Sequence, residues 1–199
     1  NMNTEKFREY QKFNSIPQWG DRIKLEGLQQ GEFQHTEDDR LFNITIINTA
    51  IGLLKNQFPD KKLKSLDVGC GKGFLLYELK KLLPKCTVAG FDISKYAIEN
   101  AKEEVRRYVF VHNAQDKYDF KGKYFDLVIS ITTLHNLFIY DLKSALQEIE
   151  RVGKNKFVVV ESYRNELELF NLQCWALTAK AFFTPEEWKW IFNEFSYTG

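Results

Sequence analysis

The sequence has little cysteine and no excess of either charge. Its three cysteines, Cys70, Cys86 and Cys174, are odd in number and widely spaced, and no two form a C-x-x-C pair. This argues against cysteine-based zinc or redox chemistry and favours a reducing cytoplasm, and we expect no metal site. With 28 basic and 27 acidic residues the formal charge is +1, so no overall field attracts nucleic acid or an anionic membrane.

Long apolar runs are also missing. No run approaches the roughly 20 residues that a membrane-spanning helix needs, and the N-terminus lacks the apolar core of a signal peptide. We therefore expect a soluble, unexported cytoplasmic protein that makes no membrane contact. Asn1 precedes Met2, which resembles the remnant of an expression tag, and we leave Asn1 out of the interpretation.

The chain has enough apolar sequence for one domain, since 44% of its 199 residues are hydrophobic. From Leu63 onward, short runs of β-branched and aromatic residues alternate with longer amphipathic stretches. This alternation is typical of a doubly wound α/β fold, a mostly parallel sheet flanked by helices. We predict a single domain over residues 1–199, with an N-terminal helical segment over 1–60, a core over 61–162 and a C-terminal helical segment over 163–199.

The expected strands cover residues 63–68, 86–92, 108–112, 125–131 and 156–162. The expected helices between them cover residues 74–83, 94–107 and 140–152, with Ser94 and Asp141 as N-caps. A long helix capped by Thr36 is expected over 36–58, and helical character over 163–183. The last helix, over 184–195, has Thr184 as its cap and Pro185 at its first position, as both residues prefer.

The stretch LDVGCGKGF, residues 66–74, forms the first strand-to-helix turn, where ligands bind in sheets of this kind. Gly69, Gly71 and Gly73 let the backbone turn sharply and approach a ligand that a Cβ would displace. The G-x-G-x-G spacing, with Asp67 two residues ahead, differs from the G-x-G-x-x-G of dinucleotide sites. The stretch resembles the first motif of class I S-adenosylmethionine-dependent methyltransferases.

This resemblance implies S-adenosylmethionine as the cofactor and S-adenosylhomocysteine as the product. It implies cofactor contacts from the loop residues Asp67, Gly69, Cys70, Gly71 and Gly73. Asp92 ends the second strand, 19 residues beyond Gly73, where a carboxylate can accept both ribose hydroxyls. Ile93 follows it in the same site. The alternative role for Asp92 is a helix cap, for which Ser94 is better placed.

Two further stretches extend the resemblance. HNAQD, residues 112–116, matches the segment near the adenine, where Asn113 or Gln115 could meet the exocyclic amine and the Ala114 backbone a ring nitrogen. The family more often has Asp at the Asn113 position, and a plain polar loop is the alternative.

FDLVISITTLHNL, residues 125–137, resembles the strand-four motif, which passes beside the methyl donor. Ile131 is expected at the cofactor. His135 is the candidate general base or acceptor-steering residue, because imidazole can take up a proton near neutral pH. A structural hydrogen bond is the alternative role for His135.

The charge pattern around the strands and the two terminal segments indicate the class of acceptor. Lysines cluster before the strands, on the side opposite the expected site, whereas the strand ends supply Asp92, Asp116, Ser130, Thr132 and Glu161. The ligand side is therefore expected to be neutral to acidic, which argues against a nucleic-acid acceptor, although solvated turn lysines would give the same pattern. Residues 1–60 are expected to form a lid and residues 163–199 the acceptor side, with Tyr10, Trp19 and Tyr163 around a small acceptor such as a sugar or an aromatic metabolite.

We therefore predict an S-adenosylmethionine-dependent methyltransferase that acts on a small molecule. One alternative is a nicotinamide-dependent oxidoreductase, which the glycine spacing and the lack of a Y-x-x-x-K pair after the fourth strand disfavour. The other is a non-catalytic S-adenosylmethionine-binding protein.

The carboxyl end of the chain is short for the family, which closes its sheet with two more strands. Only SYTG follows the last expected helix. Either the chain is truncated, which we favour, or the strand over 156–162 is an apolar edge. In the second case we expect residues 163–183 to cover that edge or to mediate a dimer, so the protein is a monomer or a dimer.

Overall fold

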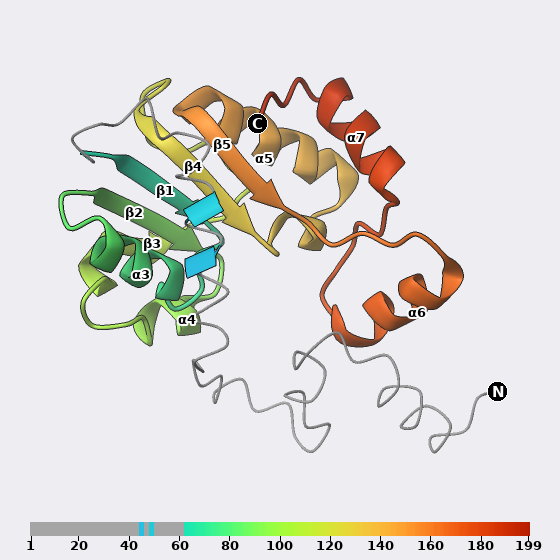
Figure 1. Cartoon of the computed structure of the whole chain (residues 1–199), viewed down its shortest axis with the longest axis horizontal. Coiled ribbons are helices and arrows are strands. Elements are labelled where there is room, and N and C mark those ends of the chain that lie inside the picture. The colour runs from blue at the N-terminus through green and yellow to red at the C-terminus, as the bar shows by residue number, and fades with distance from the viewer. Residues whose placement is uncertain (1–43, 46–47, 50–61) are drawn as a thin grey trace, which may run out of the picture.

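The computed structural model describes residues 44–45, 48–49 and 62–199. They form a five-stranded sheet in the order β3-β2-β1-β4-β5, and all of its pairings are parallel (Figure 1). The strands are β1 (Lys64–Val68), β2 (Thr87–Asp92), β3 (Val109–Val111), β4 (Phe125–Ile131) and β5 (Gly153–Val159). This confirms the predicted doubly wound sheet. The strand order changes direction between β1 and β4, so the expected ligand site lies where these two strands end.

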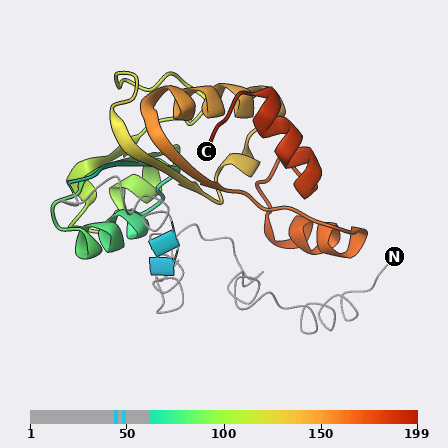
Figure 2. The same cartoon turned by 45° about the horizontal axis from the view of Figure 1, so that its top comes forward.

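Helices cover both faces of the sheet (Figures 1 and 2). The longer helices are α3 (Phe74–Leu82), α4 (Lys95–Glu99), α5 (Ile139–Val152), α6 (Glu166–Trp175) and α7 (Pro185–Glu194), and the short 3₁₀ turns are η2 (Arg106–Tyr108) and η3 (Leu134–Asn136). The alternation within β4 separates two apolar clusters. Leu127 and Ile129 pack with α3, whereas Val128 packs with α5 and α7. The period of two along the strand thus builds a core on each face.

The predicted helix over 94–107 is wrong beyond Glu99, where α4 ends. The amide of Lys102 donates to the carbonyl oxygen of Lys72 in the glycine loop, at 2.9 Å. Because a continuing helix would direct that amide to Ile98, this contact pulls the chain out of the helix. The local sequence favours a helix, but contact with the loop overrides it.

Two other boundaries differ from the prediction. Asp141 is not an N-cap, because α5 begins at Ile139 after Phe138, and Asp141 lies in the first turn, where its charge still suits the helix dipole. The fifth strand runs over 153–159 instead of 156–162, since it pairs with β4 from Phe125 to Ile131 and ends where β4 ends. The caps at Ser94 and Thr184 are confirmed, the latter as a complete capping box with Glu187.

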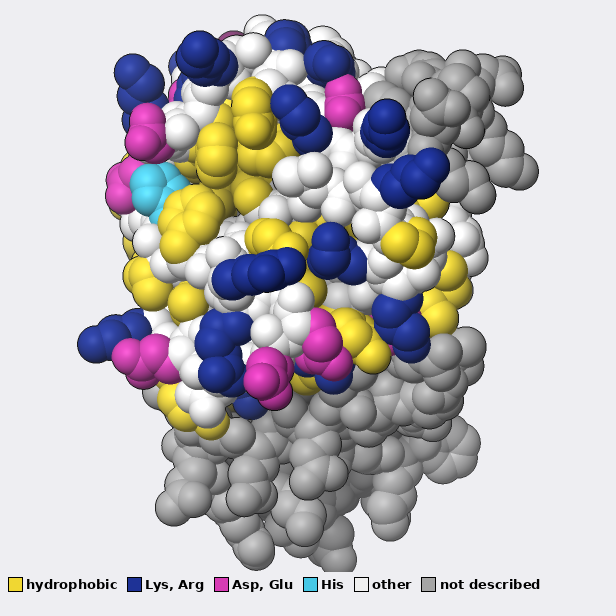
Figure 3. Space-filling view, turned by 90° about the vertical axis from the view of Figure 1, so that its left-hand side faces the viewer, with side chains coloured by type: hydrophobic (Ala, Val, Ile, Leu, Met, Phe, Trp, Pro, Cys, Tyr) yellow, Lys and Arg dark blue, Asp and Glu magenta, His cyan; other side chains and the backbone are white. Residues whose placement is uncertain are grey.

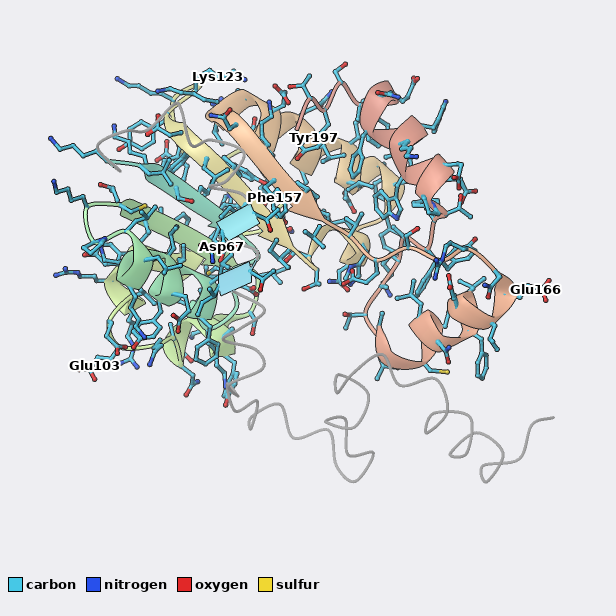
Figure 4. All side chains as sticks on the ribbon, viewed as in Figure 1. Asp67, Glu103, Lys123, Phe157, Glu166 and Tyr197 are labelled. Carbon is cyan, nitrogen blue, oxygen red and sulfur yellow. The ribbon has the colours of Figure 1, made fainter. Side chains whose placement is uncertain are left out.

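The amino ends of the strands carry charged side chains that are paired. Lys154 Nζ lies 2.8 Å from Asp126 Oδ1, and Lys156 Nζ lies 3.0 Å from Glu150 Oε1. Lys123 also contacts Glu150, and Figure 4 labels it at this end of the molecule. These lysines hold strand starts and turns together, so they are more than solvated turn residues.

The C-terminal turn lies beside β5. The amide of Thr198 donates to Glu150 Oε2 at 3.1 Å, and Lys156 Nζ donates to Thr198 Oγ1 at 2.7 Å. Tyr197 is buried in the same apolar cluster as α7. Helix α6 instead extends beyond the carboxyl end of β5 (Figures 1 and 2). Within one chain, residues 163–183 therefore do not cover the β5 edge as expected, and their role in a dimer stays a prediction.

The predicted N-terminal helix and lid fall largely outside the described residues. Residues 44–45 and 48–49 are helical, as expected within 36–58. In the part of the chain that the structure describes, no helix is both long and apolar enough to cross a membrane.

Candidate functional site

The glycine loop between β1 and α3 has a backbone that suits close ligand approach. Gly69, Gly71 and Gly73 have φ angles of 80°, 51° and 77°, a region that other residues rarely adopt. The amides of Gly69 and Cys70 both donate to the carbonyl oxygen of Phe91, each at 2.9 Å, which ties the loop to the end of β2. Among the described residues, a Cβ on Gly71 would have no atom within 4 Å, so that part of the structure leaves the loop open on this side.

The other two glycines are needed for packing inside the protein. A Cβ on Gly69 would collide with the Thr133 side chain, and one on Gly73 would lie 2.8 Å from Val105 Cγ2. The segment after β4 and the turn after α4 thus hold the loop from two sides. The middle glycine is left facing open space, and this is the position where a ligand can approach the backbone.

Asp92 links the loop to β2. Its Oδ2 accepts from the Gly71 amide at 2.9 Å and its Oδ1 accepts from the Ser94 amide at 2.8 Å. The Ser94 hydroxyl in turn caps α4 by accepting from the Ala97 amide at 3.1 Å. Each Asp92 oxygen keeps lone-pair capacity for a further donor, as a ribose diol would require. Asp92 therefore shapes the loop and is suited to hold the ribose.

Asp67, labelled in Figure 4 at the carboxyl end of β1, is a buried carboxyl in the same site. Burial, reinforced by the negative charge of Asp92, raises the pKa of Asp67 from 3.8 to about 8. Two carboxyls beside an open glycine backbone suit a cationic ligand, because a positive charge would favour their ionised forms. Burial also raises the pKa of the neighbouring Cys70 thiol, which makes Cys70 a packing residue and not a nucleophile.

The predicted adenine segment lies beside this site at the end of β3. The Asn113 Oδ1 accepts from the Gln115 amide at 3.3 Å, and the Ala114 carbonyl accepts from the Tyr118 hydroxyl at 2.9 Å. The His112 amide donates to the Asp92 carbonyl at 3.1 Å, which joins the segment to β2. The structure thus brings these residues to the same edge, and their contacts with adenine stay predictions.

Two apolar residues complete the predicted cofactor set. Ile93 is 69% exposed next to Asp92, and Ile131 is half-buried at the end of β4. An exposed isoleucine beside the Asp92 carboxyl is available to cover a bound ring system. We keep both as predicted cofactor contacts.

The turn after β4 brings His135 to the site. Thr132 has a φ of 50°, which is rare for a β-branched residue, and it directs the chain over the glycine loop, where Thr133 packs against Gly69. His135 follows in η3 and is 4% exposed. Its Nδ1 atom is in direct contact with Oε2 of Glu161, just beyond β5.

Not every predicted acceptor residue can be placed. Tyr163 is half-buried two residues beyond Glu161, whereas Tyr10 and Trp19 lie outside the described residues. Sequence reasoning noted Glu161 only as an acid at a strand end and missed its pairing with His135. It also missed Thr133, whose side chain packs against Gly69. The glycine was the available signal, because a glycine indicates that another residue comes close to the backbone at that position.

The comparisons with known proteins agree with this geometry. A family model described as "Methyltransferase domain" matches residues 59–196. The solved structure of the YcgJ protein from Bacillus subtilis is similar in fold, with a TM-score of 0.59 and 20% identity over 76% of this chain and 68% of that one.

Two curated proteins match a smaller part of the chain. The human protein named arginine-hydroxylase NDUFAF5, mitochondrial, is 32% identical over 55% of this chain. The malonyl-[acyl-carrier protein] O-methyltransferase of Legionella pneumophila is 33% identical over 44% of it. The matched region spans only 31% of each of these two relatives.

The residues present fit the ligand of this family. The open backbone at Gly71 accommodates a close approach, Asp92 suits a ribose diol, and the buried Asp67 carboxyl suits a nearby cation. The chain belongs to the methyltransferase-domain family, and its sheet has the Rossmann-like fold of the YcgJ structure.

Proposed function

We propose that the chain transfers the methyl group to a small molecule, with His135 as the general base. The observation that carries this proposal is the enclosure of His135. The ring is 4% exposed and lies in the turn that packs on the glycine loop through Thr133. If His135 is the base, an acceptor must present its reacting atom to a nearly enclosed ring, which suits a small molecule better than a broad macromolecular surface.

The distribution of charge supports the same conclusion. The carboxyl ends of the strands present Asp67, Asp92 and Glu161, whereas Lys154 and Lys156 at the amino ends are paired with carboxylates. Figure 3 faces the left-hand side of Figure 1, where the strands begin, and Lys and Arg side chains are numerous there among acidic and hydrophobic ones. A phosphate-rich acceptor would find little to bind beside the site.

Different residues would have different roles in methyl transfer. S-adenosylmethionine, when bound, supplies an electrophilic methyl group on a positively charged sulfur. The Gly69–Gly73 backbone and Asp92 would hold its nucleoside part, and Ile93, Asn113, Ala114, Gln115 and Ile131 would border it. His135 would receive the proton of the acceptor. Tyr163, with Tyr10 and Trp19, would orient the acceptor molecule. Alignment of the two reacting atoms and exclusion of water then provide most of the rate enhancement.

The test is a product assay on the full chain. The protein is incubated with S-adenosylmethionine and either a panel of sugars and phenolic metabolites, a mixed RNA, or a protein extract, and S-adenosylhomocysteine release is measured by mass spectrometry. We expect release with members of the small-molecule panel and a strong reduction in His135→Asn. Release only with RNA or with protein would overturn the proposal.

A calorimetric comparison addresses the two other functions that the sequence left open. We expect S-adenosylmethionine and S-adenosylhomocysteine to bind and the nicotinamide cofactors not to bind. Binding of a nicotinamide cofactor would contradict the assignment of the glycine loop. Binding of S-adenosylmethionine without turnover across the three acceptor classes would favour a non-catalytic role for this chain.

A further inference from the structure

Glu161 adds a charged partner to the candidate base. Its Oε2 atom and the Nδ1 atom of His135 are both enclosed, and neither has another hydrogen-bond partner among the described residues. A buried carboxylate facing one ring nitrogen is expected to accept a hydrogen bond from that nitrogen, so the ring proton stays there and the lone pair lies on the other nitrogen. The pair is thus built to define which nitrogen of His135 is basic.

We propose that Glu161 is a positioning residue that holds the proton of neutral His135 on Nδ1, and that the pair serves an acceptor whose reacting atom is a hydroxyl oxygen. This inference rests on the proposed function, because it deepens the role given there to His135.

The surroundings of the pair keep it in one geometry. The indole Nε1 of Trp188, on α7, donates to the Glu161 carbonyl at 3.0 Å. The amides of Lys180 and Ala181 donate to the His135 carbonyl at 2.8 and 2.9 Å. Both backbones are therefore held by segments that follow α6, and the two side chains meet between them. Orientation of a base by fixed neighbours in this way is what a positioned proton transfer requires.

The protons and electrons balance on a hydroxyl acceptor. The O–H bond of the acceptor breaks, and its proton passes to Nε2 of His135. The freed electron pair of the oxygen forms the new bond to the methyl carbon, and the electrons of the broken carbon–sulfur bond stay on the sulfur, which becomes neutral. His135 is then protonated on both nitrogens, and the negative charge of Glu161 stabilises that state.

The need for a base distinguishes the acceptor classes. A hydroxyl oxygen becomes a good nucleophile only as its proton leaves, so a base lowers the barrier during the transfer. A neutral amine already has a free lone pair, and a carboxylate has no proton to lose. A carboxylate would also bring its negative charge close to Glu161, which disfavours it. The His135–Glu161 pair therefore gives most to a hydroxyl acceptor.

The first experiment measures the tautomer of His135 without turnover. The chain contains three histidines, so ¹⁵N-histidine labelling gives few signals, and His135→Asn identifies the one of interest. We expect the Nδ1–H form of His135 in the wild type and in the control Glu166→Gln, which changes an exposed residue of α6. In Glu161→Gln we expect a mixture of tautomers. An unchanged Nδ1–H form in a folded Glu161→Gln variant would overturn the positioning role even if methyl transfer is confirmed.

The second experiment uses a series of phenols of increasing acidity as acceptors. Glu161→Gln should reduce kcat by about 10-fold to 100-fold with weakly acidic phenols, with little change in KM. The reduction should shrink as the phenol becomes more acidic, because an ionised acceptor needs no base. Glu166→Gln should match the wild type throughout. An equal loss across the series, or turnover confined to amines or carboxylates, would overturn the inference.

Discussion

The two ends of the sheet differ in whether their charged side chains are paired. At the amino ends, Lys154 is paired with Asp126, and Lys156 and Lys123 are paired with Glu150. At the carboxyl ends, Asp67 and Asp92 lie in one site with no described cation paired to them, and the backbone takes positive φ angles at the glycines and at Thr132. The same strands thus end in ion pairs on one side and in carboxyl groups without a described cationic partner on the other.

The difference shows that one end of the sheet contributes to stability and the other end is suited to bind a ligand. Paired charges hold turns in place and leave little for a ligand to gain. Carboxyl groups without a cationic partner and strained backbone lower the stability of the free protein and leave interactions that a cationic ligand can complete. The predictions below test this division from its largest expected effect to its smallest.

Gly71→Val should abolish cofactor binding, with affinity for S-adenosylhomocysteine reduced by at least about 100-fold. A Cβ at Gly71 meets no atom of the described residues within 4 Å, so the described fold tolerates it, but the φ of 51° strains a branched residue by roughly 1–2 kcal/mol. The side chain would also occupy the approach of the ligand. Titration calorimetry measures the affinity.

The control for this variant lies at the other end of the sheet. Gly122→Ala places a Cβ 3.6 Å from the Arg151 carbonyl oxygen, an ordinary contact, and should bind as the wild type does. Normal affinity in Gly71→Val would show that the loop is not the cofactor cradle.

Asp92→Ala should weaken cofactor affinity by roughly 30-fold to 150-fold, because a charge-assisted pair of hydrogen bonds worth about 2–3 kcal/mol is lost. Asp92 also accepts from the Gly71 and Ser94 amides, so Asp92→Asn, which keeps an acceptor oxygen, should lose less. Asp119→Ala removes the same charge from an exposed residue outside the predicted cofactor segment and serves as the control. Equal affinities in Asp92→Ala and Asp119→Ala would refute the ribose role of Asp92.

The stability of the free protein should fall as the pH rises from about 4 to about 8, because buried Asp67 keeps its proton in the folded state after the unfolded chain has lost it. Its pKa is raised from 3.8 to about 8 in the folded state, so the folded protein binds the proton more tightly than the unfolded chain. Its contribution is complete below the unfolded value and is lost as the pH rises through about 8, by at most about 1.4 kcal/mol per pH unit. Thermal unfolding across this range measures the slope.

Asp67→Asn removes the titrating group and should show a shallower slope over the same range. Binding of the cationic cofactor near neutral pH should release a proton from wild-type Asp67, detectable by calorimetry in buffers of different ionisation enthalpy. Equal slopes in both proteins would mean that Asp67 is ionised in the free enzyme.

Lys154→Gln, at the amino end, should have the smallest effect. Partial burial alone would raise the pKa of Asp126, but hydrogen bonds from Lys154 and the Lys64 amide outweigh it and hold that pKa below its ordinary value. The Lys154 side chain is 54% exposed, so the loss in unfolding free energy should stay below about 1 kcal/mol. Cofactor affinity should not change. A marked loss of affinity would show that the two ends of the sheet are coupled.

The sequence predicts best what local pattern determines. The predicted strand boundaries lie within a few residues of the observed ones, because β-branched runs and period-two alternation are local signals. The spacing of the three glycines alone predicts the loop. The predicted helix over 94–107 fails because the Lys102 amide bonds to Lys72, a residue 30 positions away in the chain. No property of the helix sequence itself reports that contact.

The candidate site divides in the same way. Asp67 and Asp92 are recognisable because they lie at the ends of predicted strands beside the loop, Asp67 next to last and Asp92 last. The contact between His135 and Glu161 forms only when β4 and β5 pair and the segment after α6 packs on both, so neither residue identifies the other in the sequence.

The hydrogen bonds that hold the His135–Glu161 pair come from residues late in the chain: Lys180, Ala181 and Trp188. During synthesis these bonds can form only after most of the chain has been made. The glycine loop, Asp92 and their strands leave the ribosome well before these three residues do. A nascent chain that has not yet reached Lys180 therefore already contains the glycine loop and Asp92, but it lacks the segments that hold His135 and Glu161 in place. Under the proposed mechanism, the parts of the chain that bind the methyl donor and the parts that hold the base are thus made at different times.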